Sequence, residues 1–334
     1  MAIRFAAALA ALALAQPVSA QSPAEFWRGK NVNVLIGVGA GGLYDITARL
    51  AARHMGRYIP GNPTLVPQNM LGAGGAAMVT WLASNAARDG TNFGAIANNF
   101  PAMQAAGVEG MRFDLGQFHW IGSISALSGT MSVWKSAGVN SIEEARTKEL
   151  IAGASGRGAD TYSMPAMLNE FLGTKFKMVM GYKGGNEINL AMERGEVQAR
   201  YNFWAAWLST RPQWIANGDV KMLVYMGPKP KGLEGVPNVT DFVKNPDDRR
   251  VVELIISGTK LGTPLAFPGG VPADRVAAMR AAFQETMKDA EFLKEAEKLQ
   301  LAVDPVRGED MQAIVAEVLA TPKDLAARAR AFLE

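Results

Sequence analysis

The stretch VNVLIGVGAGGLYDITARL, residues 32–50, decides the fold class of this chain. Its first five residues, apolar except for Asn33, have the length and composition of a short strand, and a glycine-rich turn follows at once. Beyond the glycines, Leu43, Ile46 and Leu50 recur at helical spacing, and Asp45 lies in the first turn of that helix. The stretch therefore predicts a strand, a glycine-rich turn and a helix, which is the building unit of an α/β fold.

The same unit recurs along the chain. Apolar residues at helical spacing follow the glycines of 72–75, and the Asp89-Gly90 turn leads into a predicted strand over 93–97. Further strand–loop–helix units lie around Ile151, Met178 and Val197, and another strand is predicted over 221–226. This alternation favours largely parallel sheets flanked by helices.

The length of the chain, 334 residues, favours about two domains. Residues 120–134 are apolar and contain few residues that break a strand. We therefore predict one long strand over Trp120–Trp134 that crosses from one domain to the other.

The first twenty residues have the pattern of a secretory signal peptide. A single positive charge at Arg4 precedes an apolar run over 5–15, and Val18-Ser19-Ala20 supplies small residues at a cleavage site. The apolar run is shorter than the roughly 20 residues that a membrane-spanning helix needs. We expect cleavage near Ala20 and a soluble periplasmic protein.

Composition excludes several classes of site. The chain has no cysteine and only two histidines, so disulfides, zinc ribbons, iron–sulfur clusters and thiol nucleophiles are excluded. The 34 Lys and Arg residues nearly balance the 31 Asp and Glu residues and are spread along the chain, whereas a nucleic-acid interface needs a concentrated basic patch. We expect no metal site, no cofactor and no nucleic-acid partner.

The glycine-rich loops are the candidate binding elements. Gly37, Gly39 and Gly42 match the spacing of a dinucleotide-binding turn, but no Asp or Glu lies between Asp45 and Asp89 to bind a ribose. No Gly-Lys-Ser/Thr sequence follows any of the glycine runs, which excludes a P-loop. Backbone N–H groups at the start of a helix bind anions, so several such loops meeting in one crevice would hold a carboxylate. Tight turns between strand and helix are the alternative, above all at 72–75.

Two further alternatives remain open. Ser155 lies in a Gly-Ala-Ser-Gly sequence that lacks the second glycine of a nucleophile elbow, and only His54 or His119 can serve it as a base. An exported α/β hydrolase using Ser155, or a nucleotide-binding enzyme using the 37–42 loop, is therefore the second hypothesis. The aromatic residues after 200, close to Arg200, are either core residues or the wall of a pocket for an organic acid.

The order of these motifs resembles the substrate-binding receptors of tripartite tricarboxylate transporters, the Bug family of TctC-like periplasmic solute-binding proteins. That family has Gly-Gly-x-x-Asp, Pro-Gly-Ala-Gly-Gly, Ser-Gly-x-Gly and Tyr-Lys-Gly sequences in this order. The corresponding segments here are 41–45, 71–75, 155–158 and 182–184, and Asp89-Gly90, Gly195-Glu196-Val197 and Pro268–Pro272 match weaker motifs. The similarity covers nearly all of the chain after residue 20.

The resemblance implies a two-lobed periplasmic-binding-protein fold of type II, closing on a small carboxylate. Lobe 1 would comprise residues 21–124 plus 228–334, and lobe 2 residues 125–227. Such receptors deliver their ligand to membrane permease subunits and perform no chemistry, and we expect this chain to act as a monomer. A ligand sensor for a signalling partner is a further alternative. With Trp204 added as a candidate aromatic wall, the predicted ligand-binding residues are Gly41, Gly42, Leu43, Tyr44, Asp45, Asn98, Asn99, Ser155, Gly156, Arg157, Gly158, Asp160, Thr161, Tyr182, Lys183, Gly184, Asn202, Phe203 and Trp204.

Several positions depart from the family's pattern. Tyr44 replaces a small hydroxyl residue before the loop aspartate, and Ala159 replaces a serine. Gln198 stands where the family has an aspartate, and the residues at 202–204 are larger and more aromatic than usual. These differences predict a ligand that is more aromatic or more apolar than a simple dicarboxylate.

Overall fold

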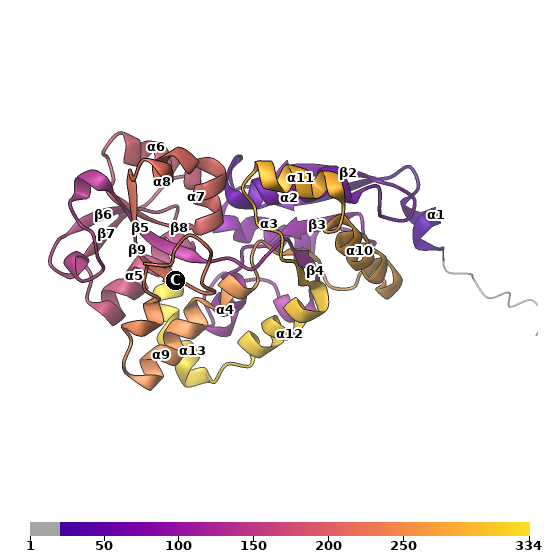
Figure 1. Cartoon of the computed structure of the whole chain (residues 1–334). Helices are drawn as coiled ribbons and strands as arrows, with labels where there is room; N and C mark the ends of the chain where they lie inside the picture. The colour runs from indigo at the N-terminus through magenta and orange to yellow at the C-terminus, as the bar shows by residue number, and fades with distance from the viewer. Residues whose placement is uncertain (1–20) are drawn as a thin grey trace, which may run out of the picture.

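The computed structural model describes residues 21–334 and is built on two β-sheets that lie side by side in an elongated molecule (Figure 1). The predicted signal peptide, residues 1–20, lies outside the described residues. Among residues 21–334, no helix combines the length and the apolar character that crossing a membrane requires. We call the part built on the six-stranded sheet lobe 1 and the part built on the five-stranded sheet lobe 2.

The strands of lobe 1 come from both ends of the chain. They are β1 (Asn31–Ile36), β2 (Thr64–Asn69), β3 (Asn92–Ala95), β4 (His119–Ser123), β10 (Leu265–Phe267) and β11 (Val306–Arg307). Their order in the sheet is β11-β4-β10-β3-β1-β2. β1 pairs in parallel with β2 and β3, whereas β10 runs antiparallel between β3 and β4, and β11 is antiparallel to β4.

The strands of lobe 2 form one continuous segment of the chain. They are β5 (Gly129–Trp134), β6 (Leu150–Gly153), β7 (Phe176–Val179), β8 (Ala199–Phe203) and β9 (Val220–Met226), in the order β7-β6-β8-β5-β9. β6 is parallel to β7 and β8, and β5 is antiparallel to β8 and β9. Most strands in each sheet thus run in the same direction, and the predicted α/β fold with two mostly parallel sheets is confirmed.

Helices cover both sheets, as Figure 1 shows. They are α1 (Pro23–Trp27), α2 (Leu43–Met55), α3 (Ala76–Ser84), α4 (Phe100–Ala105), α5 (Asp160–Leu172), α6 (Gly185–Glu193), α7 (Trp204–Thr210), α8 (Pro212–Ala216), α9 (Pro246–Ile255), α10 (Ala273–Thr286), α11 (Ala290–Lys298), α12 (Gly308–Leu319) and α13 (Lys323–Leu333). Three of them, α2, α5 and α6, begin directly after the loops that follow β1, β6 and β7. Because ligands bind outside the carboxyl ends of parallel strands, these three helix N-termini are candidates for one shared site.

The predicted long strand over Trp120–Trp134 is wrong in one respect. The chain crosses between the lobes there, but it forms two strands, β4 in lobe 1 and β5 in lobe 2, with residues 124–128 between them. Both strands are almost completely buried, and the local signals of the break, Ser125 and the Ser128-Gly129 pair, are weak because serine also occurs inside β4 and β5. A backbone hydrogen bond of 2.8 Å from the Leu127 N–H to the Thr259 carbonyl holds the connecting segment.

The C-terminal helices connect the two lobes a second time. α13 packs against α4 of lobe 1 and against α5 of lobe 2, and it also lies along α9 (Figure 1). The rings of Phe171 on α5 and Phe332 on α13 are 5.3 Å apart between centroids. Most of the buried apolar side chains of both lobes form one cluster, and a second cluster around Trp207 and Trp214 lies within lobe 2.

Candidate functional site

The first wall of the site is the glycine-rich loop between β1 and α2. Gly41 has a φ of +78°, a left-handed conformation that favours glycine, and this places its N–H 2.9 Å from Asp45 Oδ2. Asp45 Oδ1 also accepts hydrogen bonds from Arg49 Nε at 2.8 Å and Asn69 Nδ2 at 2.9 Å. Asp45 is therefore a buried residue that fixes the loop from within, and it does not line the pocket.

The start of α2 faces the space between the lobes. Gly42 is the N-cap residue and offers no side chain to the first turn of the helix, so the first N–H groups of α2 have no side-chain cap. Gly42, Leu43 and Tyr44 line the pocket. The Tyr44 hydroxyl accepts a hydrogen bond of 3.1 Å from the Asn98 N–H, which ties this helix to the loop after β3.

The second wall is the loop between β6 and α5 in lobe 2. Ser155, Asp160 and Thr161 line the pocket, and the Ser155 N–H donates a hydrogen bond of 3.0 Å to Thr161 Oγ1. The Ser155 hydroxyl lies 3.1 Å from the same Thr161 oxygen. His54 lies outside the pocket on α2, with its Nε2 2.6 Å from Glu295 Oε2. Because neither His54 nor His119 lines the pocket, the described residues offer Ser155 no histidine base.

The third wall combines the start of α6 with the end of β8. Tyr182, Lys183, Gly184 and Gly185 line the pocket together with residues 200–203. Within this wall Arg200 is buried, and its Nη1 donates hydrogen bonds to the Gly185 carbonyl at 2.7 Å and to Asn189 Oδ1 at 2.6 Å. Its guanidinium also lies over the Trp207 ring, 5.3 Å from the centroid. Burial, with a smaller contribution from Arg211, lowers the pKa of Arg200 to about 9, so the residue stays a cation at neutral pH.

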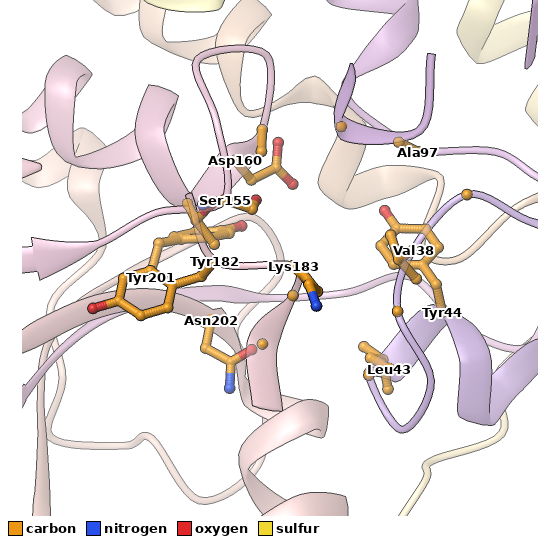
Figure 2. Close-up of a pocket in the computed structure, with 18 of the residues that line it drawn as sticks. Val38, Leu43, Tyr44, Ala97, Ser155, Asp160, Tyr182, Lys183, Tyr201 and Asn202 are labelled. Carbon is orange, nitrogen blue, oxygen red and sulfur yellow. Dashed lines mark hydrogen bonds between the residues drawn. The ribbon is translucent and has the colours of Figure 1, made fainter. Parts of the chain in front are cut away.

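The two lobes touch across the mouth of the pocket. Asn99 Nδ2 in lobe 1 donates a hydrogen bond of 3.0 Å to the Gly158 carbonyl in lobe 2. A Cβ on Gly39 would lie 3.4 Å from the Lys183 carbonyl oxygen, so the loops approach closely where lobe 1 has no side chain. These contacts border a partly open pocket of about 330 Å³, a volume at the small end of ligand pockets. Figure 2 shows Val38, Leu43, Tyr44 and Ala97 on one side and Ser155, Asp160, Lys183 and Asn202 on the other.

Asp160 is the acidic group of the pocket. It is the first residue of α5, its side chain is half-buried in the pocket wall, and its Oδ1 is fully enclosed without a hydrogen-bond partner in the described chain. Burial raises the pKa of the Asp160 carboxyl to about 7. The same charge contributes to the raised pKa values of Tyr44 and Tyr201, after the larger effect of burial, which places Asp160 near both phenol groups.

The pocket gathers most of the residues that the sequence predicts for it. The predicted residues that line it are Gly42, Leu43, Tyr44, Asn99, Ser155, Asp160, Thr161, Tyr182, Lys183, Gly184, Asn202 and Phe203. Those that do not line it are Gly41, Asp45, Asn98, Gly156, Arg157, Gly158 and Trp204. A role in binding a ligand stays a prediction for each lining residue.

Trp204 is a core residue and not a wall of the pocket. It begins α7, where the chain turns away from the sheet, and it packs in the second apolar cluster of lobe 2. Its Nε1 donates a hydrogen bond of 3.0 Å to the Lys231 carbonyl. Tyr44 does line the pocket, and its ring packs edge-on against Phe203 of lobe 2, 6.4 Å between centroids.

A second set of lining residues lies outside the predicted binding set, namely Gly37, Val38, Gly39, Leu71, Gly72, Ala73, Gly74, Ala97, Ala159, Gly185, Arg200 and Tyr201. From the sequence, the glycine-rich loops and the region of Arg200 are considered as alternatives, but these residues are not assigned to the site. Arg200 had a usable signal, because a charged residue inside an otherwise buried strand is uncommon unless it is paired or functional. The aliphatic residues had none, because only the assembled fold shows which of them face the cavity.

The fold is that of two-lobed periplasmic binding proteins. No protein-family model matches the sequence, and no curated protein matches it either. Among solved structures, the chain is similar to the periplasmic binding protein BugD, with 22% identity, a TM-score of 0.71, and coverage of 90% of this chain and 97% of BugD. This similarity confirms the fold that the resemblance to the Bug family implies.

Two similar structures contain a carboxylate ligand. MatC from Rhodopseudomonas palustris with bound malate has 18% identity and a TM-score of 0.71, over 89% of this chain and 99% of MatC. The R. palustris protein Rpa4515 with adipate has 20% identity and a TM-score of 0.71, over 91% of this chain and 98% of that one.

Proposed function

We propose that this protein is a solute-binding protein that captures a small organic carboxylate between its two lobes. The observation that carries the proposal is the buried Arg200 in the wall of the pocket between the lobes. Nη1 and Nε of Arg200 are satisfied by protein oxygens, whereas its Nη2 makes no hydrogen bond to the described residues. A guanidinium group with a free donor in a partly dry pocket is a strong partner for a carboxylate.

Two helix N-termini supplement that charge. The first turns of α2 and α6 begin at glycines that line the pocket, and each contributes unpaired N–H groups and the positive end of a helix dipole. Lys183 adds a second cation beside the start of α6. Malate and adipate, the ligands of MatC and Rpa4515, are small carboxylates of the kind that such a wall binds.

Binding is coupled to closure of the lobes. Ligand entry requires the contacts between the 37–42 loop and the 182–185 loop to open, because these loops touch across the mouth. The bond between Asn99 and Gly158 then re-forms over the ligand. In this proposal the pocket holds and releases a solute.

The cellular setting is part of the same proposal. The protein is exported by its signal peptide, acts as a monomer in the periplasm and delivers its ligand to the permease subunits of a tripartite tricarboxylate-type transporter. The similarity of the fold to periplasmic binding proteins supports this role.

A thermal-shift screen of the chain from residue 21 tests the proposal. The panel contains mono-, di- and aromatic carboxylates, amino acids and nucleotides, after unfolding and refolding to remove any co-purified ligand. A ligand at one hundred times its dissociation constant adds about 2.7 kcal/mol, which raises the midpoint by about 4 °C for a chain of this size. Stabilisation by nucleotides and by no carboxylate would contradict the proposal.

A matched pair of arginine variants tests the role of Arg200. Arg211 also lies over a tryptophan ring at 5.3 Å, that of Trp214, but it does not line the pocket. We expect R200K to weaken carboxylate binding at least tenfold, because lysine lacks the planar fork of donors. R211K should bind as the wild type does, and equal binding by both variants would contradict the assignment.

A further inference from the structure

Asp160 gives the pocket a chemical requirement that carboxylate binding alone does not explain. It lines the cavity at the start of α5, and Figure 2 shows its carboxyl group directed toward the space that separates it from Tyr44 and Val38. Its Oδ1 is fully enclosed and has no hydrogen-bond donor among the residues of 21–334. No hydrogen bond to the other carboxyl oxygen, Oδ2, is present among these residues either, and because Oδ1 is enclosed, Oδ2 is the oxygen that a ligand in the pocket can reach. A carboxyl group without any partner is destabilising, and native proteins leave few buried polar groups in that state.

No cation of the described protein supplies that partner. The pKa of Asp160 is raised by burial alone, and no nearby positive charge or hydrogen bond lowers it. Arg200 makes its ion-dipole contacts with Gly185 and Asn189, and the Arg157 guanidinium lies over the Tyr162 ring at 5.5 Å. The pocket therefore holds a carboxyl group, that of Asp160, and a cation, that of Arg200, which do not form an ion pair with each other.

When it is ionised, Asp160 also disfavours a ligand carboxylate at the start of α5. An ionised acidic residue in the first turn already occupies the favourable end of the helix dipole with its own charge. A ligand carboxylate placed there would meet a like charge in a region of low dielectric, which is strongly unfavourable. The carboxylate is thus directed to the opposite part of the wall, where Lys183, Gly184 and Arg200 lie.

We propose that the ligand is an amino-carboxylate whose ammonium group binds Asp160 and whose carboxylate binds at Arg200 and the start of α6. This inference rests on the proposed function and names the substrate class of that site. An ammonium group donates up to three hydrogen bonds, and its positive charge would pair with the ionised Asp160 carboxylate. Asp160 is then the residue that distinguishes amino acids and their analogues from amine-free acids of the same length.

The test compares acids that differ by one amino group. Titration calorimetry at pH 8 measures binding of four pairs: succinate and aspartate, glutarate and glutamate, hexanoate and 6-aminohexanoate, and 3-phenylpropanoate and phenylalanine. We expect the amino member of the best-binding pair to bind at least tenfold more tightly to the wild-type protein. D160N should remove that preference while binding of the amine-free member stays equal or becomes tighter.

D274N is the matched control, because Asp274 is also a first-turn residue of a helix, α10, but is exposed outside the pocket. It should keep the wild-type preference. Tighter binding of the amine-free member in every pair that binds would overturn the inference and leave the proposed function standing. Failure of all eight compounds and of the wider carboxylate panel would overturn the proposed function itself.

The protonation state of Asp160 provides an independent readout. If Asp160 instead donates a proton to a ligand carboxylate, binding of the amine-free acids weakens at least tenfold between pH 6 and pH 8 and D160N removes that pH dependence. This result would also overturn the inference. An ammonium ligand requires the ionised carboxylate, so its binding should strengthen over the same pH range.

Discussion

Replacing Asp160 with asparagine is expected to stabilise the ligand-free protein at pH 8, because asparagine cannot carry the charge that the empty pocket disfavours. Burial raises the pKa of Asp160 from 3.8 to about 7. Between these two pH values the folded protein keeps a proton that the unfolded chain releases. The free energy of unfolding therefore falls as the pH rises through this window and stays low above it.

The size of the effect follows from the pKa difference. Each pKa unit corresponds to about 1.4 kcal/mol, so a change of roughly three units sets an upper limit of about 4 kcal/mol. Water in the pocket screens the charge, and asparagine loses the favourable interaction of a first-turn carboxylate with the helix dipole, which is worth about 0.3–1 kcal/mol. We expect a net stabilisation of about 1–3 kcal/mol at pH 8, or about 2–5 °C in the unfolding midpoint.

The assay is thermal unfolding of the ligand-free wild-type, D160N and D274N proteins at pH 4 and pH 8. D274N measures the loss of a first-turn carboxylate outside the pocket, since Asp274 occupies the first turn of α10. Near pH 4 the wild-type and D160N midpoints should differ by less than 2 °C, because Asp160 is then protonated in the folded protein and about 40% protonated in the unfolded chain, which leaves a difference of only about 0.6 kcal/mol. A D160N effect that is equal at the two pH values, or a lower midpoint at pH 8, would refute the reasoning.

Two further substitutions separate core residues from pocket residues. W204A should lower the unfolding midpoint by about 5–8 °C, because truncating a buried aromatic residue costs about 3–5 kcal/mol. Calorimetry should show unchanged ligand affinity. Weaker binding at wild-type stability would instead place Trp204 in the site. N99A removes the hydrogen bond to the Gly158 carbonyl, so ligand binding should weaken about 2- to 10-fold while the ligand-free unfolding midpoint stays unchanged. The affinity is measured by calorimetry, with N85A at an exposed position as the control. Equal affinities of N99A and N85A would show that this bond does not stabilise closure.

The sequence predicts the strand–loop–helix units well because their signals are local. Glycines that permit a tight turn and apolar residues at helical spacing lie within about 15 residues of one another, as in 32–50. The break between β4 and β5 has only a weak signal, the Ser128-Gly129 pair at the start of β5. Both strands are buried and contain serine themselves, so this pair does not distinguish one strand in one sheet from two strands in different sheets.

The candidate site was predictable where the backbone itself forms the wall. The loops at 42–44 and 182–184 line the pocket because a helix N-terminus after a parallel strand faces the same edge of the sheet. Side-chain direction was not predictable. Asp45 turns back to Gly41 and Arg49, whereas Arg200, which the motif comparison passed over, is directed by its bonds to Gly185 and Asn189 into the pocket wall.

Asp45 and Asp160 show how the same chain treats two first-turn acids differently. Asp45 accepts hydrogen bonds from Gly41, Arg49 and Asn69, so its charge is compensated within the loop, whether or not a ligand is present. The Asp160 carboxyl accepts none from the described residues, and the proposed ammonium group would supply a partner at the carboxyl oxygen that faces the pocket. Because a stable protein could have satisfied Asp160 as it satisfies Asp45, the difference is best explained by selection for binding, at the expense of stability in the empty state. The D160N stability measurement and the D160N binding measurement therefore test one relation: the substitution that stabilises the empty pocket should be the one that abolishes recognition of the amine.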